Sequence, residues 1–218
     1  MVDENAKIPR NSSGKIIAAV IVFSISYAIV RYHLAGSVPW KDLPFFILNK
    51  GIALAAFVLV TCNFGFGPLK NLGFNIPVDW LDARKALGMT GFLLALVHVL
   101  MSFMLFSPAV YAQFFESDGT LTLLAGISML GGIAAFVVLW AYNLSFQTQL
   151  REDETFIKFI TSRKFLIWAM LLGGVHLLFM GYQGWMEPMK WHGGIPPVSL
   201  VAMLFFVVGY TANLIGRK

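Results

Sequence analysis

Six long apolar runs, separated by short polar segments, determine what this chain of 218 residues can fold into. Each run is long enough to cross about 30 Å of hydrocarbon as a helix that rises about 1.5 Å per residue. Hydrophobic residues make up 58% of the chain and charged residues only 12%, a balance that a soluble domain of this size does not have. The runs cover residues 16–34, 44–62, 86–106, 121–142, 165–185 and 198–215.

The runs are continuous and show no alternation of apolar and polar residues, so they predict helices rather than the strands of a membrane barrel. We therefore expect an all-α fold, a six-helix transmembrane bundle over residues 16–218 with a tail at 1–15. No small-residue cleavage site follows the charged start of the chain, so the first run reads as an uncleaved anchor.

The distribution of basic residues predicts the orientation. If residue 1 is cytoplasmic, twelve of the 16 lysines and arginines fall on the inside and four on the outside. This bias places both termini in the cytoplasm and the chain in the cell (inner) membrane as a multi-pass protein. The net charge of +5 then reflects anchoring at membrane lipid, and nucleic acid is not an expected partner.

Two histidines lie deep inside apolar runs, where an imidazole is costly and is usually functional. His98 follows Lys85 by 13 residues and His176 follows Lys164 by 12, which gives depths of about 20 Å and about 18 Å on two helices of the same direction. Ligands at one level on facing helices suit the iron of a haem, so we predict that His98 and His176 are the axial ligands of one haem b. The alternative is that each histidine hydrogen-bonds a neighbouring helix.

Small residues recur at the same two offsets, seven and three positions before each histidine. They are Gly91, Ala95, Ala169 and Gly173. Small side chains next to the ligands leave room for a porphyrin, although they also allow two helices to touch directly. The single cysteine, Cys62, can form neither a disulfide within the chain nor an iron–sulfur site.

Basic residues cluster where the third and fifth runs begin. They are Arg84, Lys85, Arg163 and Lys164. Lys85 and Arg163 occupy the positions 13 residues before the two histidines, where a second, inner haem would need its ligands. Such cations suit the pyrophosphate of a flavin, FAD for example, or simply anchor the helices at the interface. At the outer side, Arg31 and His33 are candidate partners for haem propionates, with snorkelling of Arg31 as the alternative.

Two stretches resemble the STEAP family of metalloreductases. The stretch PVDWLDARKALGMTGFLLALVHVLMSF is similar to the start of the family's third membrane helix, and VHLLFMGYQGWMEPMKWHGGIPPVSL is similar to its fifth helix and the loop that follows. The resemblance covers about residues 77–200. Its matching positions are Trp80, Leu81, Arg84, Lys85, Leu87, Gly88, His98, His176, Gly184, Trp185, Glu187, Pro196 and Pro197.

This resemblance implies one haem b with a histidine from each helix, a flavin across the inner half with Trp80 at its site, a homotrimer, and electron transfer to ferric or cupric ions outside. The predicted orientation puts Trp185, Glu187 and His192 at the outer face, so we expect them on the acceptor side. The chain departs from the family in the segment at 143–164 and at 192–194. It has no GxGxxG fingerprint, so we expect a separate cytoplasmic reductase to oxidise NAD(P)H.

These features predict a transmembrane oxidoreductase, similar to the metalloreductases, in which no side chain acts as an acid or base. Electrons would pass from an inner flavin or reductase through the haem to an outer acceptor. Two alternatives stay open. One is a haem subunit that feeds a periplasmic reductase, as MsrQ does in the broader ferric-reductase-like superfamily. The other is a transporter or scaffold without redox chemistry.

Overall fold

In a computed structural model, which describes residues 12–144 and 154–216, the chain is an all-α bundle with six helices long and apolar enough to cross a membrane. The predicted fold class is thus confirmed, and the chain is a multi-pass membrane protein. The long helices are α1 (Ser12–Ile29), α2 (Leu48–Asn71), α4 (Arg84–Leu105), α5 (Leu123–Leu144), α7 (Arg163–Trp185) and α8 (Val198–Ile215).

Short helical segments lie at the ends of the long helices. The π-helical turn η1 (Val30–Leu34) extends α1, and η2 (Trp40–Asp42) and η3 (Leu43–Ile47) lead into α2. The others are α3 (Val78–Asp82), η4 (Ala112–Phe114), α6 (Glu154–Ile160), η6 (Pro188–Lys190) and η7 (His192–Gly194). Helix α1 begins at Ser12, earlier than the predicted position 16, and the rest of the predicted tail lies outside the described residues.

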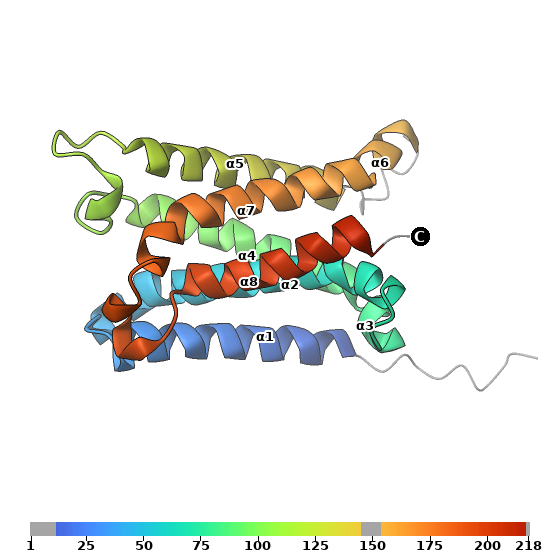
Figure 1. Cartoon of the computed structure of the whole chain (residues 1–218), viewed down its shortest axis with the longest axis horizontal. Helices are drawn as coiled ribbons and strands as arrows, with labels where there is room; N and C mark the ends of the chain where they lie inside the picture. The colour runs from blue at the N-terminus through green and yellow to red at the C-terminus, as the bar shows by residue number, and fades with distance from the viewer. Residues whose placement is uncertain (1–11, 145–153, 217–218) are drawn as a thin grey trace, which may run out of the picture.

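The bundle has two distinct ends (Figure 1). At the terminal face, α1 begins, α8 ends, and α3 and α6 lie; the loops at 106–122 and 186–197 lie at the opposite face. Helices α4 and α7 both run from the terminal face to the opposite face, as the sequence predicts. Helix α2 packs against α1, α4 and α8, whereas α7 packs against α5 and α8.

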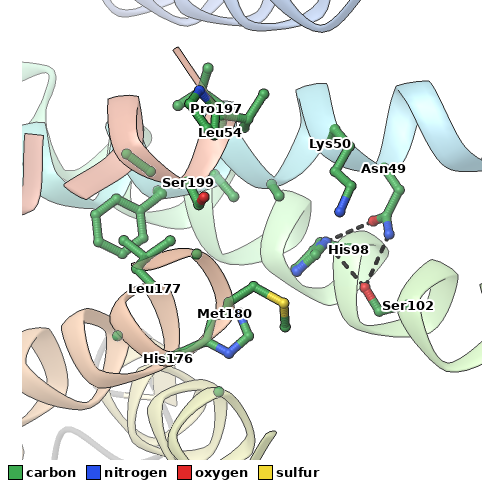
Figure 2. A pocket seen from close by; sticks show the side chains of 18 of the residues that line it. Asn49, Lys50, Leu54, His98, Ser102, His176, Leu177, Met180, Pro197 and Ser199 are labelled. Carbon is green, nitrogen blue, oxygen red and sulfur yellow. Dashed lines mark hydrogen bonds between the residues drawn. The ribbon is translucent and has the colours of Figure 1, made fainter. Parts of the chain in front are cut away.

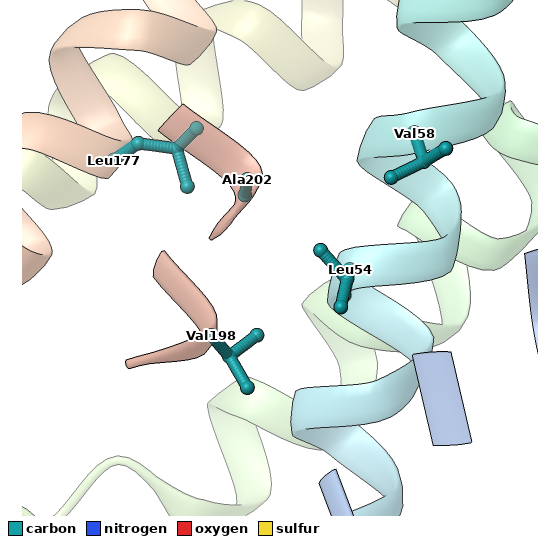
Figure 3. Close-up of a cluster of buried hydrophobic side chains, with 5 residues drawn as sticks. All are labelled: Leu54, Val58, Leu177, Val198 and Ala202. Atoms are coloured by element: carbon teal, nitrogen blue, oxygen red, sulfur yellow. The ribbon is translucent and has the colours of Figure 1, made fainter. Parts of the chain in front are cut away.

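The interior is held together by apolar contacts between α2, α7 and α8. Figure 3 shows Leu54 and Val58 of α2 facing Leu177 of α7 and Val198 and Ala202 of α8, and each of the five is buried. The outward surfaces of the long helices are also apolar, because lipid and not water surrounds them. The bundle is therefore apolar inside and outside, and the polar side chains in its interior stand out.

Helix α2 continues to Asn71, well beyond the predicted end at 62. The predicted bounds marked only the apolar run, and the glycines and Pro68 that follow it are residues that commonly terminate helices. The structure instead keeps Pro68 inside the helix. This difference matters because the added turns bring α2 to the basic cluster at the terminal face.

Two side chains from other helices support this last part of α2. Pro68 has no backbone N–H, so the carbonyl of Phe64, four residues earlier, lacks its usual helical donor. The amide Nδ2 of Asn213 lies 3.2 Å from that oxygen and donates to it. The Nε of Arg84 donates to the carbonyl of Asn63 at 2.8 Å. Hydrogen bonds from side chains of other helices thus allow α2 to continue past the proline.

Candidate functional site

A cavity of about 950 Å³ extends from the opposite face into the bundle between α4 and α7. We call it the central cavity. Helices α2, α5 and α8 line it as well, and at the opposite face its wall includes the exposed side chains of Gln113, Lys190 and His192. His98 of α4 and His176 of α7 both line it. The two histidines that the sequence singles out therefore share one internal space.

His98 is held by two polar side chains. Its Nδ1 lies 2.7 Å from Oδ1 of Asn49 on α2 and 3.3 Å from Oγ of Ser102, one turn further along α4. The Nδ2 of Asn49 donates to Oγ of Ser102 at 3.1 Å, which fixes the amide with its oxygen toward the ring. Because that oxygen can only accept, Nδ1 of His98 carries the proton and donates.

His176 is held by the backbone of α5. Its Nδ1 lies 2.9 Å from the carbonyl oxygen of Ser128, and Oγ of the same serine donates to the carbonyl of His176 at 3.0 Å. A carbonyl oxygen only accepts, so Nδ1 of His176 also carries the proton. Ser128 is completely buried. The close approach of α5 is possible because Gly131 and Gly132 present no side chain toward α7.

Both rings thus have the same tautomer, with Nδ1–H donating to the protein and the lone pair on Nε2. Neither Nε2 has a hydrogen-bond partner among the residues that the structure describes. Figure 2 shows the rings of His98 and His176 directed into the space between α4 and α7. Histidines that bind metals almost always use this arrangement, in which the other ring nitrogen donates to the protein.

The remaining histidines are different. His33 uses Nδ1 against the carbonyl oxygen of Val38 at 2.8 Å, its ring centroid lies 3.8 Å from that of Trp40, and it does not line the central cavity. His192 lines the cavity at the opposite face but is exposed. The predicted pairing of Arg31 with His33 at one anionic group is therefore not supported on the His33 side.

The predicted small residues divide into two groups. Ala95, Ala169 and Gly173 line the central cavity. Gly91 does not: a Cβ there would lie 2.8 Å from Cγ2 of Val60, so this glycine lets α4 pack directly on α2. The direct helix contact, which was the alternative interpretation of these small residues, applies at Gly91.

Two cations reach the cavity wall. Arg31, at the end of the first membrane span, is buried and donates to the carbonyl oxygen of Ile195. Lys50 of α2, which the sequence analysis did not single out, lies over the rings of Phe46 and Tyr111. Burial raises the pKa of Tyr111 to about 12, so its ring is neutral at pH 7.

Two of the three predicted acceptor residues line the central cavity, and the third does not. Glu187 and His192 line the cavity at the opposite face, and Glu187 pairs with Lys190 at 3.0 Å. Trp185 instead donates from Nε1 to Oγ of Ser199, which joins α7 to α8. Within the described ranges, no three His, Cys, Asp or Glu side chains gather closely enough to hold a metal ion.

The predicted flavin residues lie at the terminal face, away from the cavity lining. Trp80 packs on Phe66 with centroids 5.4 Å apart, and Arg84 supports α2 as described above. Lys85 and Lys164 are exposed, and the side chain of Arg163 lies outside the described residues. Two of the predicted flavin residues thus have structural partners of their own.

Sequence reasoning missed the residues that hold the histidines. Asn49 and Lys50 do leave a signal, because two adjacent polar residues interrupt the second apolar run. Ser102 follows His98 by one helical turn, which places both on one face. Ser128 offered no signal, since its contact with His176 depends on the packing of α5 against α7. No protein-family model matches the chain, and no curated protein matches it.

Proposed function

We propose that the chain binds one haem b between α4 and α7 through Nε2 of His98 and Nε2 of His176, and that it carries electrons across the membrane. The observation that supports this most is the matched pair of hydrogen bonds on Nδ1. Two histidines that only packed would not need the same tautomer or the same cavity. The lone pairs on Nε2 are what an iron with two imidazole ligands requires.

The space suits a group of this size. Cofactor pockets are commonly about 300–1,000 Å³, and the central cavity of about 950 Å³ lies in the upper part of that range. Ala95, Ala169 and Gly173 keep its walls free of bulk. Phe57, Phe136 and the other apolar residues of the lining give the space an apolar wall.

When bound, the haem supplies reversible one-electron chemistry at its iron. The protein contributes by orienting the two imidazole rings and by fixing which ring nitrogen carries the proton. Asn49 and the carbonyl of Ser128 fix the rotation of the two rings and keep the proton on Nδ1. By accepting that proton's hydrogen bond, they also increase the basicity of Nε2. The apolar walls hold the dielectric constant low around the ligands.

We further propose that electrons enter at the terminal face, taken as cytoplasmic, from FAD or another flavin or a separate NAD(P)H reductase. The resemblance to the metalloreductases and the exposed Lys85 and Lys164 support this side of the proposal. The same resemblance supports a homotrimer. The acceptor would approach the opposite face, where Glu187 and His192 line the cavity, and ferric or cupric ions are the first candidates.

A periplasmic protein is the second candidate acceptor. It is favoured by one observation: the carboxylate of Glu187 is paired with Lys190, so this face offers charged groups for docking more than ligands for an ion. The two acceptors are separated by assaying the reduced protein with ferric and cupric chelates and with soluble periplasmic extract. Oxidation by the chelates supports the first, and oxidation only by a protein fraction supports the second.

Absorption spectroscopy tests the proposed haem. The purified protein is measured before and after reduction with dithionite, together with its iron content. We expect sharp alpha and Soret bands, lost in His98→Ala and in His176→Ala and kept in the matched controls His33→Ala and His192→Ala. Colourless protein without iron, or a normal spectrum in His98→Ala, would contradict the proposal and favour a transporter or scaffold.

A further inference from the structure

Two cations line the central cavity: Arg31 is buried and Lys50 is half-buried. Only 6% of Arg31 is exposed, and its Nε is buried without a hydrogen-bond partner. Lys50 lines the same cavity. Neither cation has an aspartate or glutamate at ion-pair distance in the part of the chain that the structure describes. Positive charge inside a membrane protein is costly when nothing neutralises it.

Each of the two cations contacts an aromatic ring, and these rings form one cluster at the end of the cavity near the opposite face. The guanidinium of Arg31 lies 5.4 Å from the ring centroid of Tyr32, and Nζ of Lys50 lies 4.8 Å from that of Tyr111. Phe46 connects the two, with centroids 5.6 Å from Tyr32 and 6.0 Å from Tyr111. All five side chains line the cavity, so both charges lie beside one connected aromatic cluster.

This site adjoins the proposed haem ligands. Lys50 directly follows Asn49, whose amide holds His98. In Figure 2 the side chain of Lys50 extends toward the same space as the ring of His98. A ligand bound next to His98 would therefore present its nearer edge to Lys50. Two cations that line one cavity suit a pair of carboxylates, bound through charge-assisted hydrogen bonds.

We propose that Arg31 and Lys50 form a dicarboxylate site that binds the two propionates of the haem. This inference rests on the proposed function. The charges balance, because two propionates carry −2 and the two cations supply +2. The site also orients the porphyrin, because the edge of the porphyrin that carries the propionates must then point toward the opposite face of the bundle. Lys50 thereby replaces His33 as the second partner expected next to Arg31.

Arg31 has a second role that affects the choice of variant. It donates to the carbonyl of Ile195, and Tyr27 donates from its hydroxyl to the carbonyl of Pro196 at 2.7 Å. These two bonds hold the loop before α8 against α1. Changing Arg31 would disturb that loop as well as the site, whereas no hydrogen bond of Lys50 to a loop is seen among the described residues. Lys50 is therefore the better residue to test.

The experiment compares two porphyrins that differ only in charge. Apoprotein in detergent is titrated with ferric protoporphyrin IX or with its dimethyl ester, and binding is followed at the Soret band. We expect wild type to prefer the free acid by about tenfold or more. Lys50→Met should lose about tenfold in affinity for the free acid with little change for the ester, and Lys50→Arg should retain the preference. The exposed Lys41 provides the matched control, Lys41→Met.

Each outcome has one meaning. Equal binding of the two porphyrins by wild type overturns the dicarboxylate site while leaving the histidine ligands intact. An unchanged preference in Lys50→Met, with the spectrum of wild type, overturns the part assigned to Lys50. If neither porphyrin binds with the bands of a ligated haem, the proposed function itself fails. Size-exclusion profiles of all variants show whether any loss comes from unfolding.

Discussion

The Nδ1 atom of His98 lies 2.7 Å from Oδ1 of Asn49, a residue 49 positions earlier in the chain. The corresponding partner of His176 is a backbone carbonyl, that of Ser128. The shortest hydrogen bond of His98 is therefore to a side chain that mutation can replace, and that of His176 is to a main-chain atom that mutation cannot remove. This asymmetry allows one proposed ligand to be altered while the other serves as an internal reference.

Replacing Asn49 should weaken haem binding and shift its potential. Asn49→Leu removes the acceptor for Nδ1–H of His98, and loss of such a partner typically costs about 10–100-fold in metal affinity. Asn49→Asp supplies a stronger acceptor, so the midpoint potential in a redox titration should fall below that of wild type. Asn71→Leu on the same helix is the control, because Asn71 does not line the central cavity. Equal potentials in Asn49→Asp and wild type would speak against the hydrogen bond.

Adding one methyl group next to the other histidine should displace its ring. A Cβ at Gly132 would lie 2.7 Å from Nδ1 of His176, closer than side chains tolerate. Gly132→Ala should therefore lower haem retention and alter the Soret band. On the same helix, a Cβ at Gly126 would meet nothing within 4 Å, so Gly126→Ala should behave as wild type. A loss of equal size in both variants would point to the helix instead of the ring.

The hydrogen bond from Asn213 to the carbonyl of Phe64 should contribute measurably to the free energy of unfolding. Asn213→Ala leaves the carbonyl of Phe64 without a donor and should cost about 1 kcal/mol. Pro68→Ala returns a backbone N–H to that carbonyl, so the cost of Asn213→Ala should shrink in the Pro68→Ala background. Thermal unfolding of the four proteins in one detergent gives the coupling. Independent effects of the two substitutions would exclude this explanation.

The turn before α5 should respond to acid. Hydrogen bonds from the hydroxyl and the N–H of Thr120, at 2.6 and 2.9 Å, hold the pKa of Asp118 below its ordinary value of 3.8. A lowered pKa means that the turn is stabilised above about pH 4 and loses this support as pH falls through the folded value. The pKa of Asp118 can be measured by NMR from the pH dependence of its carboxyl carbon chemical shift. This pKa should rise in Thr120→Val and stay unchanged in Thr122→Val.

The sequence was sufficient for the membrane helices and for the direction of α4 and α7, because length and hydrophobicity alone decide where a chain can cross a bilayer. The same reasoning ended α2 too early. A proline and several glycines weaken a helix locally, and only contacts made by Asn213 and Arg84 from other helices reverse that effect. A local rule cannot include a partner that lies far along the chain.

The site shows a similar division. His98 and His176 were found because an imidazole is rare in an apolar run, so each stands out by itself. Ser128 was not, since a serine in a membrane helix is common and its role depends on α5 packing on α7. His33 was expected beside Arg31 because the two residues are close in sequence. That closeness could not predict the turn that directs the ring of His33 onto Trp40.

The depth of the two histidines has a consequence for energy conversion. Both lie about 20 Å along helices that start at the terminal face, roughly two thirds of the way through about 30 Å of hydrocarbon. An electron that reached this level from that face would cross about two thirds of the transmembrane voltage. At about 2.3 kcal/mol per charge per 100 mV, the transfer would change by about 1.5 kcal/mol for each 100 mV. Reduction from that side would thus be electrogenic, and a membrane potential that is negative at the terminal face would favour it.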